Sequence, residues 1–187
     1  MEIILQPPLL HFVTKDSKNL SQFPTLPTFL ILLIRSGSAA LGISKNGKIT
    51  DHKRITRYMV KKKQGKSQIT YFSLKGKTSG GEKIRLQQTR KFFDEINKKL
   101  IHWSNKIKGV DLILYQTSPR MWGYLFKPNN KIPFDKKDEN IFKIPYPVNK
   151  PTHKEIEKIN KILTKGIIST NIDLDFPEIV ELLEKLS

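Results

Sequence analysis

The chain has 187 residues, enough for one domain with a substantial hydrophobic core. Its 34 Lys and Arg residues outnumber 17 Asp and Glu, which gives a net charge of +17 and favours a polyanionic partner, either nucleic acid or an anionic membrane surface. There is no cysteine, which excludes a disulfide framework and a thiolate metal site. Four scattered histidines form no zinc-binding pattern.

The longest apolar run, FLILLI at 29–34, is far shorter than the roughly 20 residues that a membrane-spanning helix needs. It also lies too far from the N-terminus to be a signal peptide. The basic segments lack an amphipathic helix with a lipid-facing side. We therefore expect a cytoplasmic protein without a membrane partner.

The positive charge is concentrated in one part of the chain. Residues 45–91 contain fifteen Lys and Arg against Asp51 and Glu82, a net charge of +13, whereas residues 173–187 have a net charge of −4. This asymmetry predicts that the working surface lies within 45–91.

The predicted elements begin with a proline-containing, extended lead-in over 1–27, with an edge strand near Leu9–Thr14. Residues 29–34 are typical of a buried strand, and two further strands, 38–44 and 48–60, flank Asn46-Gly47. Asn-Gly between strands indicates a type I′ turn, in which both central residues need positive φ. The first three strands are therefore predicted to form an antiparallel meander.

A helix is predicted from the capping box of Ser79 and Glu82 to about Trp103, because apolar residues recur every three or four positions. A strand at 110–115 and a helix from Ser118-Pro119 to about 126 follow. The rest of the prediction is a strand at 140–146, a helix from Pro151-Thr152 to Thr164 with Gly166 as its stop signal, and a last helix at 177–186.

A meander followed by alternating helices and strands predicts an α/β domain with a mixed sheet and packed helices. This order is the one that the ribonuclease-H-like fold uses. We expect a lead-in at 1–27, a catalytic domain at 28–168 and an acidic C-terminal helix at 169–187.

Conventional catalytic sites are poorly represented. A two-metal nuclease needs several converging carboxylates, but the strands offer only Asp51 and Asp111, which surface solvation explains more simply. No GxSxG nucleophile motif occurs. His52 is interpreted as an exposed strand residue, although it lies near enough to the basic segment to touch RNA. We expect no metal and no cofactor.

The stretch KKKQGKSQITYFSLKGKTSGGEK, residues 61–83, has the composition of an RNA-binding loop. Its lysines would neutralise phosphates, and Gly80-Gly81 at a helix start would offer backbone N–H groups to an anion. Gln68 is neither acid nor base. Its amide would be useful in a site made mainly of RNA, where it could orient a water or stabilise an oxyanion.

Two segments carry a family resemblance. RYMVKKKQGKSQ (57–68) with SGGEKIR (79–85) resembles the release-factor-like domain of the peptidyl-tRNA hydrolases of ribosome-associated quality control, which include the ankyrin-repeat and zinc-finger peptidyl-tRNA hydrolase. DENIFKIPYPVNKPTHKEIEKI (138–159) is similar to a strand-to-helix segment of the same family. The family's domain resembles the central domain of eukaryotic class-one release factors, which has a ribonuclease-H-like fold.

The resemblance implies a hydrolase that frees the nascent chain from peptidyl-tRNA on a stalled large ribosomal subunit. We expect the protein to be a monomer. Gln68 matches the family's essential glutamine, and Gly65, Lys66 and Ser67 match its loop. Contacts to ribosomal or transfer RNA are predicted for Arg57, Tyr58, Lys61, Lys62, Lys63, Lys75, Lys77, Gly80, Gly81 and Arg85.

Two departures from the family pattern matter. Lys66 stands where the family usually has a second glycine, and the zinc finger and ankyrin repeats are missing, as in a minimal bacterial-type member. Two reactions are compatible with the resemblance: hydrolysis of the peptidyl ester, or endonucleolytic cleavage of the tRNA near its 3′ end. The main alternative is a non-catalytic ribosome- or RNA-binding protein, and a metal-dependent nuclease comes third.

Overall fold

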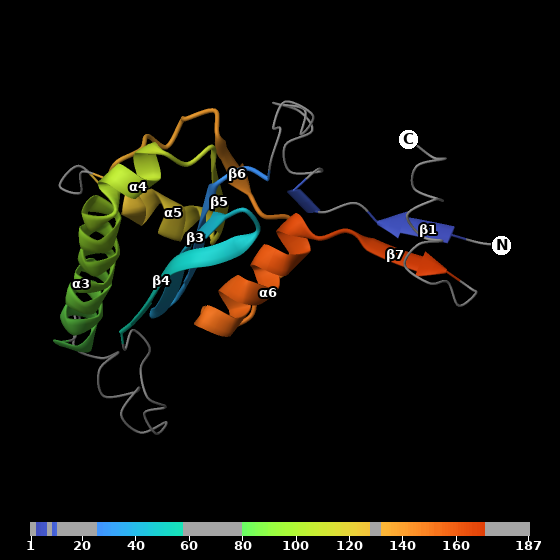
Figure 1. Cartoon of the computed structure of the whole chain (residues 1–187). Helices are drawn as coiled ribbons and strands as arrows, with labels where there is room; N and C mark the ends of the chain where they lie inside the picture. The colour runs from blue at the N-terminus through green and yellow to red at the C-terminus, as the bar shows by residue number, and fades with distance from the viewer. Residues whose placement is uncertain (1–2, 7–8, 11–25, 58–79, 128–131, 171–187) are drawn as a thin grey trace, which may run out of the picture.

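The computed structural model describes residues 3–6, 9–10, 26–57, 80–127 and 132–170. Its strands and helices are arranged as three layers, with a two-stranded sheet to one side (Figure 1). In chain order the elements are β1 (Ile3–Gln6), β2 (Phe29–Arg35), β3 (Ser38–Lys45), β4 (Lys48–Thr56), α3 (Gly80–His102), α4 (Ser104–Lys108), β5 (Leu112–Gln116), α5 (Pro119–Leu125), β6 (Ile141–Lys143), α6 (His153–Thr164) and β7 (Ile167–Thr170).

The main sheet has five strands in the order β4-β3-β2-β5-β6. Neighbours β2, β3 and β4 are antiparallel, whereas β5 is parallel to both β2 and β6. The predicted meander and mixed α/β sheet are thus confirmed, and the strand order is that of a ribonuclease-H-like sheet.

The turn between β3 and β4 has the predicted backbone. Asn46 has φ 50° and Gly47 has φ 73°, so both central residues are in the left-handed region that a type I′ turn requires. The Gly47 carbonyl accepts a 2.7 Å hydrogen bond from the buried side chain of Asn160 on α6. The hairpin tip is therefore attached to the helix that covers it.

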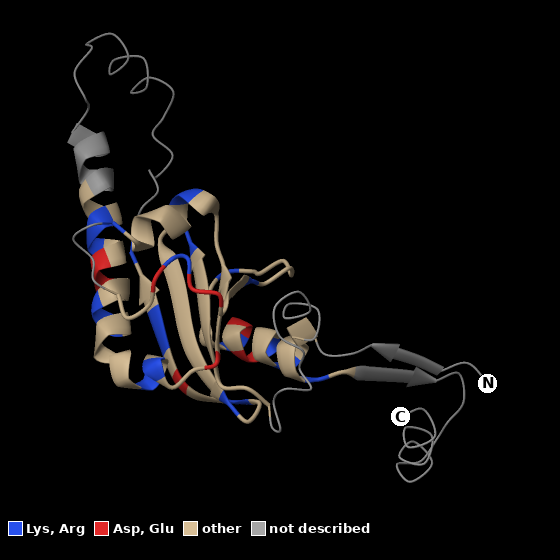
Figure 2. Ribbon diagram, turned by 90° about the horizontal axis from the view of Figure 1, so that it is seen from above, with Lys and Arg blue, Asp and Glu red and all other residues tan. Residues whose placement is uncertain are grey.

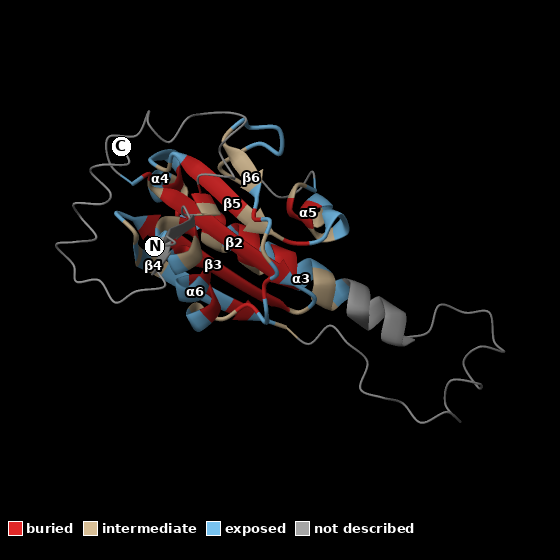
Figure 3. Ribbon diagram, turned by 90° about the vertical axis from the view of Figure 1, so that its right-hand side faces the viewer, coloured by how far each residue is buried: buried red, intermediate tan, exposed pale blue. Residues whose placement is uncertain are grey.

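The helices form a layer on each face of the sheet. On β2, Leu30, Leu32 and Ile34 pack in the cluster with α3, α4 and α5, whereas Phe29, Ile31 and Leu33 pack in the cluster with α6. Because side chains alternate between the two faces of a strand, a strand covered on both sides is a continuous apolar run. Figure 3 shows this buried centre of the sheet.

Helix α6 lies close to the meander. The Thr152 hydroxyl accepts a 3.2 Å hydrogen bond from the Glu155 N–H and caps the helix, as the Pro151-Thr152 signal predicted. A Cβ added to Gly42 of β3 would lie 2.7 Å from Ile156 Cγ2, closer than such atoms come. A glycine is needed there because the helix and the strand approach so closely.

Several predicted boundaries were wrong. Leu9 and Leu10 have helical rather than strand backbone, β4 ends at Thr56, and β6 has only three residues. The helix predicted from Ser79 to about Trp103 is observed as α3, Gly80–His102, but the short helix α4 that follows was not predicted. The last predicted helix, 177–186, lies outside the described residues.

Strands β1 and β7 were not predicted as a pair. They form an antiparallel two-stranded sheet in which Ile3 is opposite Thr170 and Gln6 is opposite Ile167. In the described part of the chain, no helix has the length and apolar character that crossing a membrane requires.

Candidate nucleic-acid interface

Most of the predicted loop lies outside the described residues. This applies to Tyr58, Lys61, Lys62, Lys63, Gly65, Lys66, Ser67, Gln68, Lys75 and Lys77, all within 58–79. The structure describes the two attachment points of that segment, which are Arg57 after β4 and the first turns of α3, where Gly80, Gly81 and Arg85 lie.

Arg57 fixes the first attachment point. Its N–H donates a 2.9 Å hydrogen bond to the Gly37 carbonyl in the turn between β2 and β3. Its Nε and Nη2 lie 3.1 and 3.0 Å from Oε2 of Glu95 on α3. The Arg57 side chain remains 36% exposed, so the guanidinium joins β4 to α3 while part of its surface faces solvent.

The second attachment point is far from the first. Gly80 is the first residue of α3, and Glu95 is fifteen residues further along the helix. At 1.5 Å per residue this separation is about 22 Å along the helix axis. The segment 58–79, which contains six lysines and no acidic residue, therefore joins the sheet beside Glu95 to a helix end about 22 Å away.

Further basic side chains are exposed along α3 and β4, the two elements that segment 58–79 connects. On α3, Arg90, Lys91 and Lys98 are exposed, together with one acidic residue, Asp94. On the edge strand β4, the exposed basic side chains are Lys48, Lys53 and Arg54. Lys and Arg are distributed along both elements in Figure 2.

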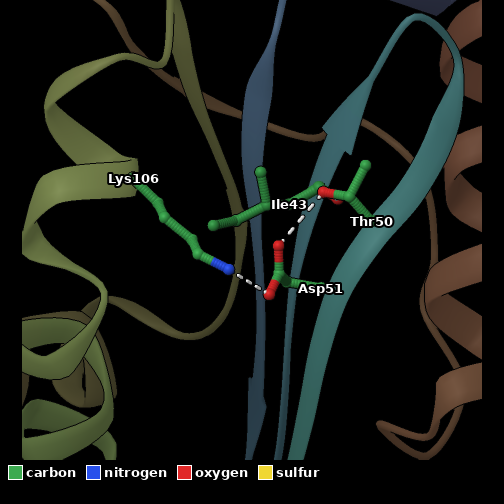
Figure 4. Close-up of polar contacts among 4 residues, drawn as sticks. All are labelled: Ile43, Thr50, Asp51 and Lys106. Carbon is green, nitrogen blue, oxygen red and sulfur yellow. Dashed lines mark hydrogen bonds and ion pairs between the residues drawn. The ribbon is translucent and has the colours of Figure 1, made fainter.

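The two aspartates considered as metal ligands make structural contacts. Asp51 Oδ1 accepts a 2.5 Å hydrogen bond from Lys106 Nζ, and its Oδ2 accepts one from the Thr50 hydroxyl (Figure 4). Asp111 Oδ2 accepts a 2.7 Å hydrogen bond from the Thr28 N–H. Among the described residues, no group of three or more His, Cys, Asp or Glu could hold a metal ion.

Asp51 and Lys106 lie in an open pocket of about 300 Å³ at the opposite end of the sheet from Arg57. The Lys106 hydrogen bond and charge hold the pKa of Asp51 below its ordinary value of 3.8, against the opposing effect of burial. The pocket is lined by Thr28, Ile43, Lys45, Thr50, Asp51, Lys106 and Gly109.

His52 is exposed on β4, as predicted, and it also makes a defined contact. Its ring stacks on that of His153 at the start of α6, with centroids 3.8 Å apart and planes 22° apart. His153 Nε2 lies 3.3 Å from Glu157 Oε1. The two histidines thus join β4 to α6.

Sequence reasoning missed the partners of the predicted residues. Glu95 shows no local signal for its pairing with Arg57, which is 38 positions earlier in the chain. The exposed lysines of α6 were also missed, although their spacing in the sequence is visible.

These features define a mixed α/β domain of ribonuclease-H-like topology with a basic segment of the chain, 58–79, between β4 and α3. The family described as Bacteroidetes VLRF1 release factor matches residues 29–171, and the chain belongs to that family. No curated protein matches the chain.

Eight solved chains match the structure. One, titled "Vms1 mitochondrial localization core", has a TM-score of 0.53 at 18% identity, over 82% of this chain and 62% of the other. At that identity the likeness concerns the fold, and this chain spans less than two thirds of that protein's structure. The suspected relationship to release-factor-like proteins is confirmed by the family match.

Proposed function

We propose that this protein is a ribosome-rescue factor that releases nascent chains from peptidyl-tRNA on stalled large ribosomal subunits. The segment 58–79 enters the peptidyl transferase centre, and Gln68 acts at the scissile bond. Membership of a release-factor family over 29–171, a range that includes the whole segment, supports this role.

The observation that carries the proposal is the way in which the segment is attached. One end is fixed by the Arg57–Glu95 ion pair, and the other continues into α3 about 22 Å further along the helix axis. A basic segment held at two separated points of a rigid fold can enter a recessed RNA site while the body of the domain stays outside. Its six lysines provide the affinity for phosphates.

Gln68 suits a reaction whose site is supplied by RNA. In ester hydrolysis a water oxygen bonds to the peptidyl carbonyl carbon, the carbon–oxygen bond to the ribose breaks, and the ribose oxygen gains a proton. The carboxamide of Gln68 orients the water, or the backbone N–H at this position donates to the developing oxyanion. Neither role requires Gln68 to change its charge.

The test uses isolated large subunits that carry doubly labelled peptidyl-tRNA, with one label on the peptide and one on the tRNA. Ester hydrolysis gives free peptide and full-length tRNA. Cleavage at the tRNA 3′ end instead leaves the peptide attached to a short nucleotide, so the size of the tRNA product identifies the bond. A reaction that stops in chelator favours the nuclease alternative, whereas binding without either product favours the RNA-binding alternative.

A further inference from the structure

Helix α6 carries a row of lysines that belongs to none of the sites described above. The row consists of Lys154, Lys158 and Lys161 in the helix and Lys165 at its C-cap, and all four are exposed. They follow the spacing i, i+4, i+7 and i+11. We call them the α6 lysine row.

The row lies opposite the side of α6 that packs on the sheet. At 100° per residue, the three helical lysines fall within an arc of about 60°, centred roughly opposite the buried residues. Those buried residues are Glu155, Ile156, Ile159, Asn160 and Leu163. The lysines therefore form the outermost surface of this layer, where a flat or convex partner meets them first.

Acidic side chains do not neutralise the row. Glu155 is buried and accepts a 2.8 Å hydrogen bond from the Asn149 N–H, and Glu157 pairs with His153. None of the ion pairs among the described residues includes a lysine of the row. Glu157 is the i−4 neighbour of Lys161, but its carboxylate lies 3.3 Å from His153 Nε2 and forms no ion pair with Lys161, so the four lysines remain available to an external anion.

The row begins beside the attachment of the basic segment. The Pro151 carbonyl accepts a 3.1 Å hydrogen bond from the Ser38 hydroxyl, and neighbouring Gly37 accepts the Arg57 N–H. At its other end, Asn160 holds α6 to the hairpin tip at Gly47. The row thus extends for about 16 Å from the root of segment 58–79 along the outer surface of the domain.

We propose that the α6 lysine row binds the phosphate backbone of double-stranded RNA, as a second contact separate from segment 58–79. A straight row of charges on a rigid helix suits the regular backbone of a duplex, which proteins contact largely through shape and phosphates. Single strands usually require aromatic stacking surfaces. Here Tyr146, whose ring centroid lies 5.6 Å from Lys158 Nζ, is partly buried, and the rings of His52 and His153 are stacked on each other. This inference rests on the proposed function, which identifies the duplex as a helical part of ribosomal or transfer RNA.

The experiment measures binding of the full chain to a short fluorescent RNA duplex at several salt concentrations. The test variant is Lys154→Gln/Lys158→Gln/Lys161→Gln. The control, Lys127→Gln/Lys136→Gln/Lys137→Gln, removes the same charge from exposed positions in and beside the segment between α5 and β6. We expect the test variant to bind the duplex about tenfold more weakly. The slope of log affinity against log salt concentration should fall by the amount that corresponds to two to three lost phosphate contacts. The control should bind like wild type, and both variants should melt like wild type.

Equal weakening by both triple variants would overturn the inference, since only total charge would then matter. Binding to anionic lipid vesicles with none to the duplex would also overturn it. The release reaction separates this inference from the proposed function. If the α6 variant requires more protein but releases peptide normally at saturation, both stand. If it loses duplex binding while wild type releases no peptide, only the proposed function fails.

Discussion

Arg57 and Glu95 form an ion pair, with Nη2 3.0 Å from Oε2, at the point where the meander ends and the basic segment begins. This pair joins the edge strand of the sheet to the middle of α3. Because Arg57 also donates its N–H to Gly37, both its backbone and its side chain are fixed. The segment that contains Gln68 therefore starts from a defined position.

We expect Arg57→Ala and Glu95→Ala to destabilise the fold by similar small amounts, about 0.5 kcal/mol each, because both side chains are more than a third exposed. The double variant should cost less than the sum of the two single variants, since each removes the same interaction. Urea unfolding of all four proteins measures this coupling. Fully additive losses would show that the pair contributes nothing to stability.

RNA affinity distinguishes the roles of Arg57 and Glu95. If Arg57 also contacts RNA through its exposed surface, Arg57→Ala weakens RNA binding while Glu95→Ala does not, because removing an acid leaves the basic surface intact. Equal affinities for the two variants would restrict Arg57 to a structural role.

Gly42→Ala should destabilise the protein by about 1–3 kcal/mol, because the new methyl group would lie 2.7 Å from Ile156 Cγ2 and would push α6 away from β3. Gly123→Ala is the matched control. Gly123 is exposed in α5, and an added Cβ there meets nothing within 4 Å, so this change should stabilise by about 0.5–1 kcal/mol through helix propensity. Thermal denaturation reports both effects. A Gly42→Ala protein as stable as wild type would contradict the close packing of α6.

The Asp51–Lys106 pair should contribute to stability in a pH-dependent way. The Lys106 hydrogen bond lowers the pKa of Asp51 below 3.8, so the folded state favours the carboxylate. The resulting stabilisation is present above the unfolded-state pKa and is lost as the pH falls through the folded-state pKa. Since Lys106 is 54% exposed, we expect less than about 1 kcal/mol.

This contribution is measured as the difference in unfolding free energy between wild type and Asp51→Asn from neutral pH down to about pH 2. In Lys106→Met, an NMR titration should show the pKa of Asp51 raised toward 3.8. An unchanged titration in that variant would assign the lowered pKa to other groups.

The sequence predicted those elements that depend on a few neighbouring residues. Asn46-Gly47 predicted a hairpin because few residues accept positive φ, and the apolar run at 29–34 predicted a strand covered on both faces. The short helix α4 was not predicted, because its five residues, Ser104–Lys108, include one apolar position and so show no helical periodicity.

Long-range contacts could not be predicted in this way. The pairing of β1 with β7 joins residues at opposite ends of the chain, and the Arg57–Glu95 pair depends on how α3 packs beside β4. The sequence predicted the helix that contains the α6 lysines. That they form an outward row became clear only when the buried side of the helix was known.

The central claim is that Gln68 acts in release and not in binding. The most direct measurement compares wild type and Gln68→Ala on isolated large subunits carrying labelled peptidyl-tRNA, with bound protein and free peptide followed in the same samples at saturating protein. We predict equal binding and a release rate at least about a hundredfold lower for Gln68→Ala, the scale of losing one oxyanion-stabilising donor. Equal release by the two proteins would contradict the account, and the basic segment would then serve RNA binding alone.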